Sequence, residues 1–212
     1  MSEEKFSRRS FFKGLGATAV ATAAQRAEGV AEELNKLNSE KIQGPGAVPI
    51  TLKINGQPAT FQLEPRVTLL DVLRNHSSLT GAKEVCDRGS CGACTVLLNG
   101  TATYACMVLA IEVQGAEITT IEGLAAEGEM TPLQEAFIAC DGLQCGYCTP
   151  GFIMSLSALI AKNPQPTEKD MRKACSGNLC RCGSYPRVFE SAMKAVGISV
   201  ASKCEIVRVG DV

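Results

Sequence analysis

The chain has 212 residues, of which 45% are hydrophobic, and its formal net charge is −1. This length allows one large or two small domains with an ordinary core. The near-neutral charge gives no basic surface for nucleic acid, and the absence of Trp, with 5% aromatic residues, leaves few stacking platforms for bases or sugars. The composition therefore predicts no nucleic-acid partner.

The N-terminal segment resembles an export signal. Residues Ser7–Lys13 (Ser-Arg-Arg-Ser-Phe-Phe-Lys) are similar to a twin-arginine signal, and Gly14–Ala24 is weakly apolar but too short to span a bilayer. Ala21 and Ala23 offer a cleavage site of the A-x-A kind. We expect folded export to the periplasm and no integral membrane anchor; the alternative is a basic amphipathic segment without a targeting role.

A small sheet is predicted next. Ile50–Ile54 and Ala59–Leu63 alternate apolar and polar residues around Asn55-Gly56, which is typical of a hairpin with a type I′ turn. Thr68, with Asp71 three residues later, predicts a capped helix start. A closing strand is expected over residues 117–121.

The first cysteine group lies between this helix and the closing strand. Cys86, Cys91 and Cys94 have the C-x4-C-x2-C spacing of plant-type [2Fe–2S] ferredoxins, and Gly89 and Gly92 permit the tight loop that such a cluster needs. Four thiolates also suit zinc, but structural zinc sites usually combine two C-x2-4-C pairs, and this group has one.

A second Asn-Gly turn predicts the fourth ligand. If the flanking strands pair outward from Asn99-Gly100, Thr95 meets Tyr104 and Cys94 lies opposite Ala105. Cys106, one residue further, is then brought back to the loop that holds the other three cysteines.

The second cysteine group lies in a helical region. Helices are expected to begin near Thr131-Pro132, Thr149-Pro150, Thr167 and Pro186, which predicts four short antiparallel helices. The cysteines between them are Cys145, Cys148, Cys180 and Cys182. A [2Fe–2S] cluster just before the helix at Thr149 would benefit from its N-terminal partial charge. A redox-active C-x2-C pair and a zinc site are the alternatives.

Three further cysteines match no ligand position. Cys140, Cys175 and Cys204 are expected to be small buried hydrophobic residues, with a disulfide possible where two lie within bridging distance.

Taken together, the motifs resemble those of the molybdenum hydroxylase family, most closely the small subunits of periplasmic aldehyde oxidoreductases. They are Cys86–Val96, Gln144–Gly151 (Gln-Cys-Gly-Tyr-Cys-Thr-Pro-Gly) and Gly177–Gly183 (Gly-Asn-Leu-Cys-Arg-Cys-Gly). The resemblance covers roughly residues 50–196, and Val85 departs from it where the family often has Gly.

The resemblance implies a relay of electrons and no catalytic residues on this chain. A large partner subunit would bind molybdenum on a pterin cofactor, and Gln144 would contact that pterin; the alternative for Gln144 is a capping residue before the cluster loop. Electrons would pass to the second cysteine group, then to the first, and on to FAD in a medium subunit, giving a heterotrimer. Aldehydes are the preferred substrates, with xanthine, nicotinate and isoquinoline types open.

We therefore expect an α+β chain with four segments. They are a signal and linker (1–47), a β-grasp ferredoxin-like domain (48–123), a four-helix-bundle cluster domain (124–200) and a C-terminal tail (201–212). A free-standing two-cluster carrier and a zinc-stabilised interaction module are the competing hypotheses.

Overall fold

A computed structural model of the chain describes residues 44–126 and 128–199. The predicted export signal (Ser7–Lys13), the predicted C-terminal tail and Cys204 lie outside the described residues. Within the described part of the chain, no helix is both long enough and apolar enough to cross a membrane.

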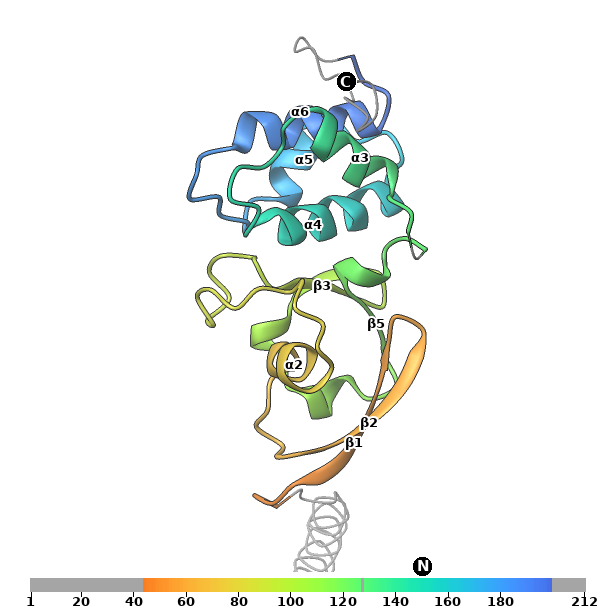
Figure 1. Cartoon of the computed structure of the whole chain (residues 1–212), viewed down its shortest axis with the longest axis vertical. Helices are drawn as coiled ribbons and strands as arrows, with labels where there is room; N and C mark the ends of the chain where they lie inside the picture. Colours follow the sequence, from red (N-terminus) through yellow and green to blue (C-terminus); the bar gives the residue numbers. More distant parts are fainter. Residues whose placement is uncertain (1–43, 127, 200–212) are drawn as a thin grey trace, which may run out of the picture. The chain divides into compact units, whose positions relative to one another are not determined.

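The first half of the described chain is built on a five-stranded mixed sheet (Figure 1). The strands are β1 (Val48–Ile54), β2 (Gln57–Leu63), β3 (Thr95–Leu98), β4 (Thr101–Tyr104) and β5 (Glu117–Thr119), in the order β2-β1-β5-β3-β4. Strands β1 and β5 are parallel, whereas the β1–β2, β3–β4 and β3–β5 pairs are antiparallel. We call this half, from β1 to η4, the sheet lobe.

Both predicted Asn-Gly turns are present. Asn55 and Gly56 have φ values of 49° and 80°, and Asn99 and Gly100 have values of 49° and 75°. Positive φ at both central residues is the signature of a type I′ turn, which matches the twist of the strands it connects. The predicted register around the second turn is confirmed, since Thr95 pairs with Tyr104.

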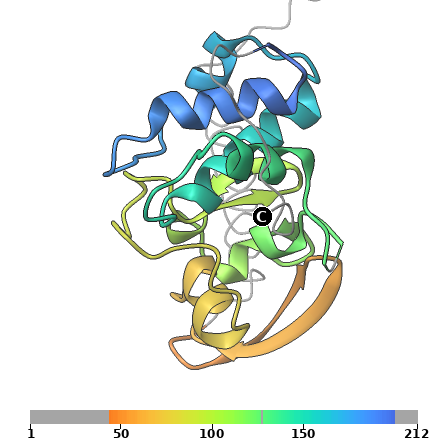
Figure 2. The same cartoon turned by 45° about the horizontal axis from the view of Figure 1, so that its top comes forward.

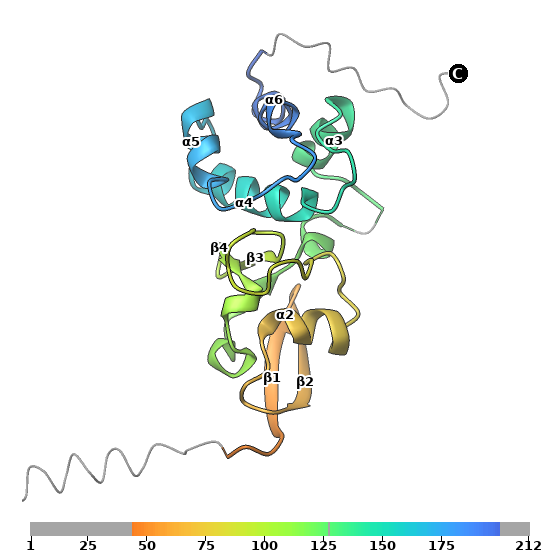
Figure 3. The ribbon, with the colours of Figure 1, turned by 90° about the vertical axis from the view of Figure 1, so that its left-hand side faces the viewer.

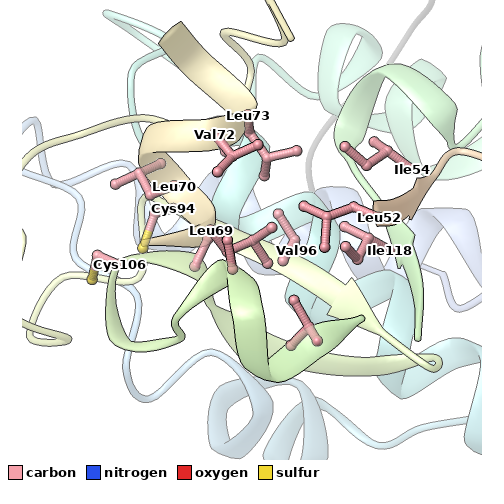
Figure 4. Close-up of a cluster of buried hydrophobic side chains, with 14 of the residues drawn as sticks. Leu52, Ile54, Leu69, Leu70, Val72, Leu73, Cys94, Val96, Cys106 and Ile118 are labelled. Atoms are coloured by element: carbon pink, nitrogen blue, oxygen red, sulfur yellow. The ribbon is translucent and has the colours of Figure 1, made fainter. Parts of the chain in front are cut away.

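The predicted helix at Thr68 packs over the sheet. It comprises α2 (Leu69–Asp71), which continues as a π-helical turn, η1 (Val72–His76). The backbone N–H of Asp71 donates to Thr68 Oγ1 over 3.2 Å, so the predicted cap is present. Figure 4 shows the apolar side chains of this segment meeting those of β1, β3 and β5 in the core, with Leu69, Val72 and Leu73 fully buried.

The remaining connections of the sheet lobe are 3₁₀ turns, namely η2 (Ala105–Met107), η3 (Ala110–Val113) and η4 (Ile121–Gly123). The closing strand is shorter than the predicted span of residues 117–121. It ends at Thr119 because the backbone turns into η4, where the side chain of Asn55 binds both the N–H and the hydroxyl of Thr120.

Four helices make up the second half, the helical lobe (Figure 3). They are α3 (Pro132–Ala139), α4 (Thr149–Lys162), α5 (Glu168–Ala174) and α6 (Tyr185–Ala195). The predicted capping boxes at Thr131 and Thr167 are both present. A separate core, which includes Phe137, Phe152 and Met171, joins these helices.

The two lobes meet where α4 packs against β3 (Figures 1 and 2). A mixed sheet with a helix on one face, followed by a helical lobe, makes the described chain α+β, as predicted. The first cysteine group lies on the sheet-lobe side of this contact, and the second group lies on the helical-lobe side.

Candidate iron–sulfur cluster sites

The first cysteine loop is a tight turn that directs backbone N–H groups at sulfur. Asp87, Gly89 and Gly92 all have positive φ, which only glycine adopts at no steric cost. The N–H of Gly89 donates to Cys106 Sγ, and the N–H of Ser90 donates to Cys86 Sγ, each over 3.3 Å. Hydrogen bonds of this kind stabilise negative charge on sulfur ligands.

Cys106 arrives at the loop by the predicted route. The β3–β4 hairpin places Ala105 beside Cys94, whose carbonyl accepts the Ala105 N–H over 3.3 Å. Cys106 follows in η2 and is buried, and Figure 4 shows the sulfurs of Cys94 and Cys106 at the edge of the apolar core. The fold thus brings Cys106 to the loop that holds the other three cysteines.

The four thiols of this group differ strongly in acidity. Burial opposes ionisation of Cys86, but hydrogen bonds from the backbone at Arg88 and from Cys91 outweigh it and lower its pKa to about 6. Burial raises the pKa of Cys94 to about 12, helped by the neighbouring Cys106. Cys86 therefore ionises readily, whereas the buried Cys94 needs a nearby cation to stabilise its thiolate.

The second group forms where α4 begins. Cys148 is the N-cap of α4, so its sulfur lies at the positive end of a 14-residue helix. Cys180 Sγ accepts the N–H of Ser184 over 3.4 Å, and the N–H of Cys180 donates to the Tyr185 hydroxyl over 2.9 Å. These hydrogen bonds tie the loop after α5 to the start of α6 at Ser184 and Tyr185.

The pKa values of the thiols in the second group are also shifted in opposite directions. Burial raises the pKa of Cys148 to about 12. A hydrogen bond from the backbone at Tyr147, followed by one from Cys182, lowers the pKa of Cys145. Burial opposes ionisation of Cys180, but backbone hydrogen bonding at Ser184 prevails and lowers its pKa as well.

Within each group the pKa values of the thiols depend on a neighbouring thiol. The pairs of neighbours are Cys86 with Cys91 and Cys94 with Cys106 in the first group. In the second group they are Cys145 with Cys182 and Cys148 with Cys180.

A [2Fe–2S] cluster takes four cysteine ligands, two for each iron. The paired thiols, the N–H donors aimed at sulfur and the helix N-terminus are therefore suited to binding a [2Fe–2S] cluster. Among the described residues, no set of three or more His, Cys, Asp or Glu side chains has the arrangement of a site for a single metal ion.

A pocket of about 420 Å³ is lined by members of both groups. It is lined by Cys91 of the first group, by Cys145, Cys148 and Cys180 of the second, and by exposed side chains such as Leu179. Cys91 is therefore the member of the first group that shares this pocket with the second.

Gln144 lies in an exposed bend directly before Cys145. The helix α4 begins after Cys148, and no side chain caps it. The amide is thus accessible beside the second group.

The three extra cysteines have different environments. Cys175 is a free, buried thiol, and burial raises its pKa to about 12, as expected of a small core residue. Cys140 is equally buried but is disulfide-bonded. Cys204 lies outside the described residues.

Sequence reasoning missed the residues that join the two groups. Asn178 is buried and donates to the carbonyl of Gly92 over 3.0 Å, while Ser155 of α4 donates to its side-chain oxygen over 2.9 Å. Tyr104 covers Gly177 so closely that no side chain could be placed there. A polar residue that directly precedes a ligand segment is the one signal that could have indicated Asn178.

Comparison with known proteins identifies both lobes. Residues 52–125 match the family described as "2Fe-2S iron-sulfur cluster binding domain", and residues 120–193 match the "[2Fe-2S] binding domain" family.

Two curated relatives resemble most of the chain. The aldehyde oxidoreductase iron-sulfur-binding subunit PaoA of Escherichia coli K12 is 44% identical over 168 residues, which cover 72% of this chain and 73% of that protein. The nicotine 6-hydroxylase small subunit of Paenarthrobacter nicotinovorans is 45% identical over 150 residues, covering 71% and 90%.

Solved structures share the fold. A chain of quinoline 2-oxidoreductase from Pseudomonas putida 86 superimposes with a TM-score of 0.69 at 39% identity, covering 71% of this chain and 94% of that one. Aldehyde oxidoreductase from Desulfovibrio gigas gives 0.67 at 38% identity, with 70% of this chain matching 17% of that one.

Proposed function

The chain belongs to the iron–sulfur small subunits of the molybdenum hydroxylase family, and we propose that its two cysteine groups each hold one [2Fe–2S] cluster of an electron relay. The ligands would be Cys86, Cys91, Cys94 and Cys106 for the first cluster and Cys145, Cys148, Cys180 and Cys182 for the second. Such clusters supply one-electron steps, while the protein sets their potentials through hydrogen bonds and burial. The chain is thus an electron-transfer subunit of an oxidoreductase.

One observation carries this proposal. Each lobe brings together four thiols that form two pairs of neighbours, and members of both groups line one pocket. A single redox-active C-x2-C pair would need neither Cys180 nor Cys182, and a free thiol framework would leave the aimed N–H donors without a purpose.

Electrons are proposed to enter at the second group. The exposed Gln144 beside Cys145 offers a side-chain amide to the pterin of a large molybdenum-binding subunit. Exposed apolar side chains around the pocket, Tyr147 and Leu179, support a partner at the same face. The first group would then pass electrons to FAD in a medium subunit of a heterotrimer.

The substrate would bind on the partner subunit. Aldehydes are the proposed class, in line with the similarity to PaoA. Subunits of a nicotine hydroxylase and a quinoline oxidoreductase match this chain to a similar degree, so the small subunit carries little of the substrate preference.

Purification of the tagged chain with its native partners tests the assembly. We expect a large subunit, molybdenum and FAD to copurify, and Gln144→Ala to slow reduction of the second cluster by substrate without loss of iron. Recovery of a fully iron-loaded chain without molybdenum or a large partner would instead favour the free-standing carrier.

We also propose export to the periplasm by the twin-arginine route. Clusters inserted in the cytoplasm would protect the ligand thiols from an oxidising compartment, and this route carries folded proteins. Replacing Arg8 and Arg9 by Lys should retain the loaded protein in the cytoplasm. Unchanged export of this double variant would refute the signal assignment.

The segment limits belong to the same proposal. We assign residues 1–47 to signal and linker, 48–123 and 124–200 to the two cluster domains, and 201–212 to a tail, with α3 to α6 acting as a four-helix bundle around the second group.

A further inference from the structure

The two lobes are tied together by one buried amide between the cysteine groups. Asn178 is 3% exposed, and its Nδ2 donates to the carbonyl oxygen of Gly92 over 3.0 Å. Its Oδ1 accepts from Ser155 Oγ over 2.9 Å, and its backbone N–H donates to the carbonyl oxygen of Cys175 over 2.9 Å. Loss of one of these partners would leave a buried polar group unsatisfied, which costs free energy of folding. The hydrogen bonds therefore fix the position of the Asn178 side chain.

A second hydrogen bond lies beside this amide. The N–H of Leu179 donates to the carbonyl oxygen of Cys91 over 2.9 Å. Leu179 is bonded to Cys180, a proposed ligand of the second cluster, and Cys91 is a proposed ligand of the first. A short path of bonds from the sulfur of Cys91 to the sulfur of Cys180 therefore runs through the two backbone segments and crosses between them at this one hydrogen bond.

Glycines allow the backbones to approach this closely. A Cβ at Gly92 would lie 2.6 Å from Asn178 Nδ2 and 2.7 Å from the carbonyl oxygen of Gly177. A Cβ at Gly151, on α4, would overlap the carbonyl oxygen of Gly92, and one at Gly177 would overlap the Tyr104 hydroxyl. We call Gly92, Gly151 and Gly177 the glycine seam.

We propose that Asn178 is a positioning residue for electron transfer between the two clusters. It holds the loop of Cys180 against the loop of Cys91, so that the separation of the cluster sites is fixed and the Leu179–Cys91 hydrogen bond is kept. The glycine seam makes this separation short. This inference rests on the proposed function, because it takes the eight cysteines as cluster ligands.

The test compares two matched substitutions in the full chain. Asn178→Asp keeps the acceptor oxygen and removes the amide donor to Gly92. Asn55→Asp does the same in the sheet lobe, where Nδ2 donates to Thr120 Oγ1 over 3.0 Å and Oδ1 accepts the Thr120 N–H over 2.9 Å. Both changes replace an amide donor by a carboxylate oxygen, but only the first lies between the cysteine groups, where the lost donor faces the carbonyl oxygen of Gly92.

Iron content and visible absorbance report cluster loading, and EPR of the fully reduced protein reports the magnetic interaction between the clusters. We expect the splitting from this interaction to decrease in Asn178→Asp and to stay at the wild-type value in Asn55→Asp, with both proteins fully loaded. A stabilising role alone would lower the unfolding midpoint of both variants and leave the splitting of both unchanged.

A second variant keeps the test independent of Asn178→Asp folding well. Gly151→Ala introduces a better helix former into α4, so the helix itself is not weakened, yet its methyl group must push the seam apart. We expect the same loss of splitting. Wild-type splitting in loaded Asn178→Asp and Gly151→Ala would overturn the inference, whereas absence of both cluster signals from the wild-type chain would contradict the proposed function itself.

Discussion

Cysteine thiols of similar exposure have pKa values shifted in opposite directions because burial and hydrogen bonding act unequally on them. Cys86 and Cys148 are both half-buried, but the Cys86 thiol receives backbone hydrogen bonds that outweigh its burial, whereas burial dominates at Cys148. Ligand thiolates must lose their protons when metal binds. The low-pKa cysteines of each group are therefore the natural first ligands during cluster insertion.

This difference gives a pH-dependent prediction for the metal-free protein. The pKa of Cys86 is lowered to about 6, so its thiolate should predominate above that pH and be lost as the pH falls through it. Cys148, with a pKa raised to about 12, should remain protonated at neutral pH. Iodoacetamide labelling read by mass spectrometry across pH 5–9 should show Cys86 reacting much faster than Cys148. Equal labelling of both would contradict the assigned environments.

The fourth ligand of the first group provides a second prediction. Cys106→Ser should abolish the EPR signal of the first cluster and leave that of the second, because Cys106 lies only in the first group and neighbours Cys94. Cys175→Ser, which changes a free cysteine outside both groups, is the control and should leave both signals. An unchanged pair of signals in Cys106→Ser would show that another residue completes the site.

Ligand identities were accessible from sequence, but the residues that support them were not. Cysteine spacing and an Asn-Gly turn were enough to bring Cys106 to the loop. The role of Asn178 depends on a hydrogen bond to a glycine 86 residues away, so its place before a ligand segment could draw attention to it but could not identify its partner. The sequence likewise could not decide whether Cys140 forms a disulfide, because bridging depends on the distance between two cysteines in the fold.

At the scale of elements, turns and helix caps determine where each cysteine lies in the fold. Type I′ turns fix the register of both hairpins, and the capping boxes at Thr131 and Thr167 begin α3 and α5 at the predicted residues. These signals are local, which is why sequence located them well. The end of β5 was less accessible, since it depends on hydrogen bonds between Asn55 and Thr120.

Adjacent positions of α3 allow a sharp test of the helical core. Phe137 is 1% exposed in the core of the helical lobe, whereas Ile138 is 55% exposed. Phe137→Ala should cost about 3–5 kcal/mol of unfolding free energy through lost burial and a cavity. Ile138→Ala should cost less than about 0.5 kcal/mol, as expected for a surface position. Denaturant unfolding of the loaded protein, followed by circular dichroism, measures both; similar losses would mean that α3 packs differently.

For the whole molecule, function follows from the way two lobes with separate cores present their cysteines to one another. The two lobes are joined by the contact of α4 with β3 and by the hydrogen bonds at Cys91 and Gly92. Sequence predicted each lobe through its own periodicity. Their contact depends on interlocking surfaces and close glycines, which periodicity does not encode.

The central claim is that one chain carries two distinct [2Fe–2S] clusters. It is tested most directly by metal analysis together with EPR of the reduced wild-type protein. The account predicts about 4 irons per chain, since each cluster has two, and two separable signals of equal spin intensity. A colourless protein that contains zinc, or a single cluster signal with about 2 irons per chain, would contradict it.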